Sequence, residues 1–188
     1  MTARILLSVF LWAAAAAAAP LDRPHEIRMS LDDRFHLAPS DRWDVSVERE
    51  LSLRFADVHI TPRTGQDFDL MLYFKCDTPD LAVFDTPEKM ERSLLKSSES
   101  YRPHVRETIF EPKRLDVGGR YGFLLVLTDA KLTDLDVVPE GQFKYLFRGM
   151  VRLSDDSALG FSLMANERDS PLVDELLGYA YGFVRAKE

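Results

Sequence analysis

Apolar and polar residues alternate along most of the chain beyond residue 40, and this two-residue period predicts half-buried β-strands. Short clusters of glycine, proline, aspartate and serine interrupt the alternation, as turns do between strands. The pair Gly118-Gly119 predicts a hairpin turn. The strands predicted in this way lie at 43–60, as one strand or two before a turn at 61–65, and at 68–76, 108–115, 121–127, 143–153 and 158–164.

Two segments have the longer period of amphipathic helices. The Asp-Thr-Pro-Glu sequence at 85–88 combines a capping side chain, a proline for the first turn and an early acid, and it predicts a helix over 87–101 that Pro103 stops. A second helix is predicted where Ser170 and Pro171 form the same kind of cap. Its apolar stripe, which must face a sheet, consists of Val173, Leu176, Leu177, Ala180 and Val184.

This order of elements is typical of a layered α+β domain. Several strands precede one helix, four strands follow it, and a second helix closes the chain. The order predicts an antiparallel sheet of about six to seven strands covered by helices. We expect a single α+β domain over 41–188, preceded at 19–40 by an N-terminal arm that is either extended or a weak opening strand.

The first 18 residues predict a cleavable secretory signal peptide. Arg4 supplies a small positive region, and the 14 residues of 5–18 form an uncharged, mainly apolar run that ends in alanines. This run is shorter than the roughly 20 residues that a membrane-spanning helix needs. Cleavage after Ala18 is preferred to cleavage after Ala19, which would leave Pro20 directly beyond the cut. The alternatives are an uncleaved N-terminal anchor and a buried alanine-rich helix.

Export predicts a periplasmic or secreted protein of 170 residues, with a formal net charge of −8 in place of −7. A chain of this size buries roughly 70% of its unfolded surface and needs no disulfide to hold its core. We expect no transmembrane segment after cleavage, because no second apolar run is long enough. The acidic charge and the lack of a basic run argue against nucleic acid, and against an anionic membrane, as partners.

The chain contains a single cysteine, Cys76, so it can form no intramolecular disulfide. This residue shares one face of the 68–76 strand with four apolar side chains, and a buried core thiol is preferred to a reactive nucleophile. A shared zinc site would require distant segments to converge, and structural or solvent-facing roles are expected for the histidines. The four histidines are His25, His36, His59 and His104, and none of them belongs to a His-Glu-x-x-His motif.

Two further patterns fall short of known catalytic and metal sites. The sequence 160–164 begins like a nucleophile elbow around Ser162 but lacks the second glycine, so a plain sheet residue is preferred. Lys131 lies within an acidic cluster that lacks the turn glycine and the closing glutamate of a calcium loop, so a turn whose aspartate accepts backbone hydrogen bonds is preferred. The carboxylates of this cluster are Asp129, Asp134 and Asp136.

A set of short motifs follows one another in a definite order. They are Ile60-Thr61-Pro62 with Gly65, the capped Asp85-Thr86-Pro87-Glu88 helix, Gly122-Phe123 leading to Leu127-Thr128-Asp129, and Gly149 in the strand before Leu163. In order and spacing they resemble the PsbP-like family over most of residues 40–186, as an exported bacterial branch. The resemblance implies an αβα sandwich that serves noncatalytic partner binding elsewhere, in a lumenal photosystem subunit and in a nuclear-import factor that binds a small GTPase. No functional residue of either branch matches a position in this chain, and an export signal contradicts the nuclear role.

No motif indicates catalysis, a cofactor or a metal ion, and we therefore assign no catalytic, cofactor-binding or metal-ligating residue. The prediction is an exported, noncatalytic binding or accessory domain whose partner is a protein or a small apolar ligand. Such a module should have a groove or an exposed apolar patch on the sheet face opposite the helices, or at the edge of the sheet. A small periplasmic hydrolase and a structural subunit of an envelope complex are the alternative hypotheses.

Overall fold

The computed structural model describes residues 25–28, 34–37, 39–50, 55–64, 67–76, 82, 84–182 and 184–185. The predicted signal peptide at 1–18 lies outside the described residues. Within the predicted arm the structure places two short strands, β1 (His25–Arg28) and β2 (Arg34–Leu37). Strand β2 pairs with both β1 and β10 (Val184–Arg185), so a three-stranded antiparallel sheet joins the arm to the C-terminal segment.

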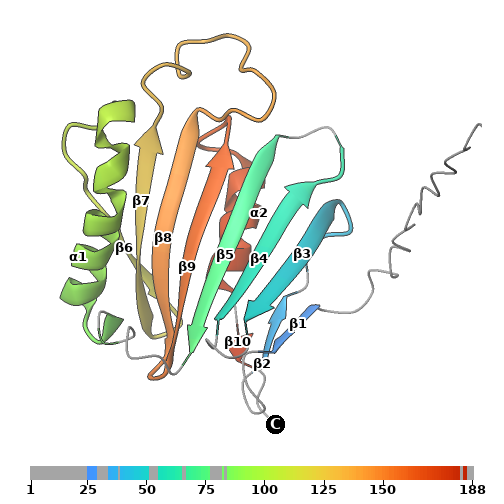
Figure 1. Cartoon of the computed structure of the whole chain (residues 1–188), viewed down its shortest axis with the longest axis vertical. Helices are drawn as coiled ribbons and strands as arrows, with labels where there is room; N and C mark the ends of the chain where they lie inside the picture. Colours follow the sequence, from blue (N-terminus) through green and yellow to red (C-terminus); the bar gives the residue numbers. More distant parts are fainter. Residues whose placement is uncertain are drawn as a thin grey trace, which may run out of the picture.

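The main body is a seven-stranded sheet with the order β3-β4-β5-β9-β8-β7-β6, in which every neighbouring pair is antiparallel (Figure 1). Two runs of adjacent strands, β3 to β5 and β6 to β9, meet where β5 pairs with β9. The predicted α+β fold and antiparallel sheet are thereby confirmed. The strands are β3 (Trp43–Glu50), β4 (Phe55–Pro62), β5 (Phe68–Cys76), β6 (Lys113–Val117), β7 (Arg120–Thr128), β8 (Tyr145–Ser154) and β9 (Ser157–Ala165).

Two α-helices begin at the two predicted caps. Helix α1 (Pro87–Ser98) begins after Thr86, whose hydroxyl oxygen accepts a hydrogen bond from the Lys89 amide at 3.3 Å. Helix α2 (Pro171–Tyr181) begins after Ser170, whose hydroxyl oxygen accepts from the Val173 amide at 3.3 Å. Each cap satisfies an amide that the helix itself leaves without a partner.

Alternate side chains of the strands point to opposite sides of the sheet, and each side has its own apolar cluster. On one side, the buried stripe of α2 packs with inward residues of β3, β4, β5, β8 and β9, and Phe161 of β9 lies in this cluster. On the other side, Met90 and Leu94 of α1 pack with Phe123, Leu125 and Leu127 of β7. We call these the α2 side and the α1 side.

Helix α1 lies along the end of the sheet formed by β6, β7 and β8 (Figure 1), and its contacts are with β7 and β8. Strands β3 and β4 carry polar residues on the same side of the sheet. Ser46, Glu48 and His59 are exposed there. This part of the α1 side is therefore open among the described residues.

The predicted hairpin at 118–119 is confirmed. Gly118 and Gly119 have φ angles of 58° and 80° and connect β6 to β7. Positive φ at both central positions is the geometry of a type I′ turn, which glycine adopts without steric cost. However, β6 begins at Lys113, so the strand predicted from residue 108 is too long.

The segment before β6 packs on a 3₁₀ helix, η3 (Glu99–His104), and this is why it does not pair in the sheet. The Arg102 side chain donates a hydrogen bond to the Thr108 carbonyl at 3.0 Å and lies 4.3 Å over the centre of the Phe110 ring. These contacts join residues six to eight positions apart in sequence. The hydrogen bond satisfies the Thr108 carbonyl, which in the predicted strand would have paired with a neighbouring strand.

Both predicted helix ends need correction. Helix α1 stops at Ser98 and continues as η3 through Pro103, whereas an α-helix to residue 101 was predicted. The hydroxyls of Ser97 and Ser98 both donate to the Leu94 carbonyl, in competition with the backbone. Helix α2 ends at Tyr181 because Gly182 caps it, so Val184 belongs to β10 and not to the helix stripe.

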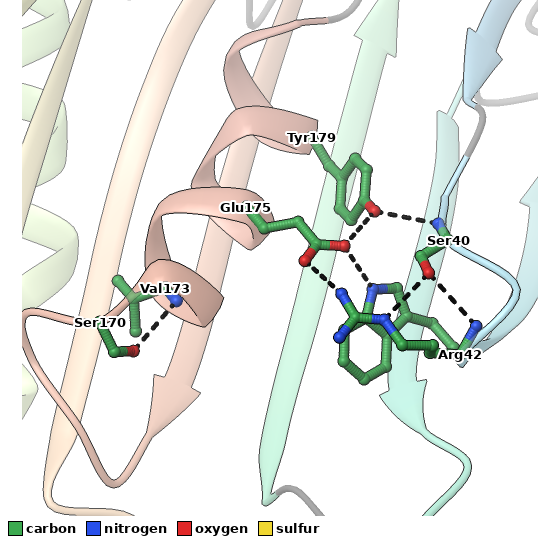
Figure 2. Close-up of polar contacts among 7 residues, drawn as sticks. Ser40, Arg42, Ser170, Val173, Glu175 and Tyr179 are labelled. Carbon is green, nitrogen blue, oxygen red and sulfur yellow. Dashed lines mark hydrogen bonds and ion pairs between the residues drawn. The ribbon is translucent and has the colours of Figure 1, made fainter.

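One polar network joins α2 to the start of β3 (Figure 2). The Glu175 carboxylate accepts hydrogen bonds from Trp43 Nε1 at 3.1 Å, from the Tyr179 hydroxyl at 2.8 Å and from Arg42 Nη2 at 2.6 Å. The Tyr179 hydroxyl in turn accepts from the Ser40 amide at 3.0 Å. Burial alone would raise the pKa of Glu175, but these donors together hold that pKa below its usual value.

Candidate functional site

A cavity of about 400 Å³ lies between α1 and the α1 side of strands β5, β9 and β8. Leu94 and Ser93 of α1 form one wall, and Tyr73 of β5 forms another. Its volume falls within the range of roughly 300–1,000 Å³ that small-molecule sites occupy in proteins. The sequence predicted a groove on a face opposite the helices or at the edge of the sheet, and this cavity lies beside α1 instead.

Small residues of β9 create the cavity. Ala158, Gly160 and Ser162 occupy three successive positions on the α1 side of β9, so the floor there is low. Larger side chains stand on both neighbouring strands, Tyr73 on β5 and Met150 on β8, and each pairs with Gly160. A methyl group at Gly160 would meet Tyr73 carbons only at 3.9 Å and 4.0 Å, which is ordinary contact.

Arg148 of β8 closes one end of the cavity by reaching α1. Its Nη1 donates hydrogen bonds to the Ser97 carbonyl at 2.7 Å and to Ser98 Oγ at 3.1 Å, and the guanidinium carbon lies 5.1 Å from the centre of the Tyr101 ring. These contacts pack Arg148 against the last turn of α1, where it is partly buried.

A second hollow of about 250 Å³ continues over β3, β4 and β5. Its lining includes Glu48, Asp57 and His59, and it shares Tyr73 with the first cavity. The Tyr73 hydroxyl donates to the Met71 sulfur at 3.1 Å, so the ring stands between the two hollows. The charged residues that line the first cavity are basic, whereas the second hollow has an acidic end at β4, formed by Glu48 and Asp57.

The acidic end holds its carboxylates at an electrostatic cost. Burial raises the pKa of Asp57, and the nearby Glu48 charge raises it further. One Asp57 oxygen, Oδ1, is buried without a hydrogen-bond donor among the described residues. Burial likewise raises the pKa of the Tyr73 phenol, with further contributions from Asp57 and Asp69. The ionised form of Asp57 is therefore less favourable in the folded chain than in the unfolded chain.

Replacing Asp57 with asparagine is expected to raise the thermal midpoint at pH 7, because it removes a partly buried negative charge that lies near Glu48. The rise should be only about 1–2 °C, because solvent screens the exposed part of the side chain. Since the native pKa is raised, ionisation destabilises the folded state as the pH rises through it. The gain of Asp57→Asn over the wild type should therefore shrink in acid, as thermal melts at pH 7 and pH 3.5 would test. Asp44→Asn is the control on β3. It should bring no gain, because Arg63 Nε already pairs with Asp44 at 2.8 Å.

The structure separates the candidate nucleophile from the candidate bases. Ser162 lies on the cavity floor and pairs in register with Met71 and Arg148. His59 pairs with Met71 on its far side, so two strand spacings, roughly 10 Å, separate His59 from Ser162. This separation exceeds hydrogen-bond reach. His59 instead lies 3.7 Å from an Asp69 oxygen.

The remaining histidines and the cysteine do not join this site. His36 and His104 are exposed, on β2 and at the end of η3. The backbone of His25 lies in β1 and that of Cys76 ends β5, whereas their side chains lie outside what the structure describes. The prediction of a buried thiol at Cys76 thus stays a prediction.

The acidic cluster near residue 130 is a turn, as its sequence indicated. Asp129 Oδ1 accepts hydrogen bonds from the Lys131 and Leu132 amides, both at 2.8 Å. Asp134 pairs with Arg106, and Asp136 is exposed. No group of three or more His, Cys, Asp or Glu side chains that could hold a metal ion is found within the described ranges. No helix described in the structure has the length and apolar character needed to cross a bilayer.

Arg148 and Tyr73, which line the cavity, could not be identified as site residues from the sequence. They meet there only because α1 and the sheet approach one another in the folded chain. One signal was available, the run of small residues at 158, 160 and 162 on a single face of a strand.

In comparisons with known proteins, no family model matches the chain, and no curated protein matches it either.

Proposed function

We propose that the protein is a noncatalytic binding domain that holds a small, mainly apolar ligand in the cavity beneath α1. One observation carries the proposal, the cavity of about 400 Å³ whose floor is made of Ala158, Gly160 and Ser162. A sheet that served only as scaffold would place larger side chains here, since interiors are otherwise close-packed. Apolar carbons of Phe84, Leu94 and Met150 around this floor offer a ligand the burial that drives binding.

The proposal extends to the architecture and the place of action. The two apolar clusters on opposite sides of the sheet support an αβα arrangement like the one that the PsbP-like resemblance implies. Contacts of α1 with β7 and β8, and of α2 with β9, support it as well. The apolar N-terminal run supports export to the periplasm or out of the cell, where such a module would bind its ligand.

Gly160→Leu is expected to abolish binding of a neutral apolar fluorophore, N-phenyl-1-naphthylamine, while leaving the fold intact. The leucine side chain would fill the cavity from its floor, because a Cβ at this position has no close neighbour. It would also replace a weak strand former, so the thermal midpoint should stay equal or rise. Fluorescence titration measures the first effect and a thermal melt measures the second.

Gly178→Leu is the matched control. Gly178 is exposed on α2 and has nothing within 4 Å of a built Cβ, far from the cavity lining. The control variant should bind the fluorophore as the wild type does. Full binding by a folded Gly160→Leu variant would contradict the proposal, and so would a wild-type protein that does not bind the fluorophore at all.

A further inference from the structure

The cavity beneath α1 has a charge pattern opposite to that of the whole chain. The protein carries a formal net charge of −7. Two cationic side chains, Arg148 and Lys75, line the cavity, and no aspartate or glutamate is among the described residues that line it. In an acidic protein, a cavity lined by cations alone focuses attraction on an anionic ligand.

The guanidinium of Arg148 leaves one edge unused. Nη1 is occupied by the Ser97 carbonyl and Ser98 Oγ. Nε is buried and has no hydrogen-bond partner, and Nη2 makes no hydrogen bond to a described residue. Nε and Nη2 together form the edge that binds a carboxylate through two parallel hydrogen bonds. A buried N–H group without an acceptor is costly, so an acceptor placed beside Nε would stabilise the folded chain.

Ser162 adds a hydroxyl to the same place. It pairs in register with Arg148 on the neighbouring strand, and both side chains are on the α1 side. Directly opposed residues have their Cβ atoms about 5 Å apart, so the Ser162 hydroxyl lies on the cavity floor beside the position from which the Arg148 side chain extends towards α1. Among the described residues, no hydrogen bond of the Ser162 side chain is found. The hydroxyl is therefore available as a donor.

We infer that the ligand of this cavity is a monocarboxylate with an apolar tail, its carboxylate held by the Nε and Nη2 edge of Arg148 and by the Ser162 hydroxyl. This inference rests on the proposed function and names its ligand class. The tail would extend over Gly160 along Tyr73 and Met150, where the lining is apolar. The acidic groups beyond Tyr73, Asp57 and Glu48, favour a singly charged head over a phosphate that carries more charge.

Decanoate is expected to displace N-phenyl-1-naphthylamine from the wild-type protein at a concentration about tenfold lower than decanol does, since a charge-assisted bidentate pair is worth about one factor of ten or more. Arg148→Gln should remove this advantage for decanoate and leave decanol unchanged. Arg148→Lys should restore it only in part, because an ammonium lacks the fork. Arg152→Gln is the matched control. It removes the same charge from the α1 side of β8 at a residue outside the cavity lining, and it should behave as the wild type does.

A direct measurement on the wild type covers the case in which Arg148 variants unfold. The ¹H–¹⁵N signal of Arg148 Nε, assigned in the wild type through its bonded side-chain carbons, should move on addition of decanoate and stay in place with decanol. If decanoate and decanol displace N-phenyl-1-naphthylamine equally well, the inference of a carboxylate ligand is wrong, although the proposed binding function still holds. Tighter displacement by decyl phosphate than by decanoate would overturn it as well. Failure of the wild type to bind the fluorophore, decanoate or decanol would overturn both.

Discussion

Gly149→Ala is expected to destabilise the protein by about 3 kcal/mol, the largest effect of any single methyl group considered in this fold. A Cβ at Gly149 would lie 2.0 Å, 2.2 Å and 2.8 Å from three carbons of the Phe161 ring. Such separations are impossible, so the ring must move. Phe161 is buried at the centre of the α2 side and packs edge-on against Tyr181, with ring centres 5.8 Å apart. The ring therefore has no free space to enter.

Urea unfolding and thermal melts would measure this loss, with an expected fall in the midpoint of about 10 °C for a chain of this size. Gly160→Ala is the matched control. Gly160 pairs with Met150, the residue after Gly149 in β8, and it faces the open cavity. The double variant Gly149→Ala/Phe161→Leu should lose less free energy of unfolding than the two single variants lose together, because the smaller side chain at residue 161 removes the clash. A near-neutral Gly149→Ala would show that the Phe161 ring is not fixed as described.

Glu175→Ala is expected to cost about 2–3 kcal/mol at pH 7, because it removes the common acceptor of Trp43, Tyr179 and Arg42 (Figure 2). The Trp43 indole is almost fully buried, so its N–H would lose its only described acceptor and find no water in exchange. The Arg42 pair adds less, since that side chain is 56% exposed. Urea unfolding curves of the variant and the wild type give the difference.

The same network predicts a dependence on pH. The folded-state pKa of Glu175 is lowered, so its contribution is complete above the unfolded pKa, about 4.3, and is lost as the pH falls through the folded value. The stability gap between wild type and Glu175→Ala should therefore narrow between pH 5 and pH 2.5. Glu167→Ala is the control, because Glu167 is exposed. It should change stability little at either pH. A gap of constant size across this range would show that the carboxylate charge does not hold the network.

The strands and the helix starts could be predicted because their causes are local. Alternation places Phe68, Leu70, Leu72 and Phe74 on one face of β5, and all four are buried as expected. The caps at Thr86 and Ser170 act within three residues of the chain, so their sequence is sufficient to locate them. Helix ends were harder. At Ser98 a serine hydroxyl competes with the backbone for the Leu94 carbonyl, and at Gly182 the helix ends one turn before the apolar pattern does.

The candidate site depends on residues that meet only across strands. Arg148, Ser162 and Tyr73 lie on three neighbouring strands, and register alone decides that the first two oppose one another. A shift of one residue would have turned either side chain to the α2 side. Alternation cannot reveal such a register, since it repeats every two residues along each strand separately.

The α+β class, the antiparallel pattern of strands, both helix caps and the exclusion of an intramolecular disulfide could be derived from the amino-acid sequence, because each follows from residue type, spacing or the single cysteine. The pairing of β5 with β9, and the cavity between α1 and the small residues of β9, are seen only in the folded chain. The difference lies in the distance along the chain over which each cause acts. Periodicity and capping act over a few residues, whereas a binding cavity is made by packing between segments that are dozens of residues apart.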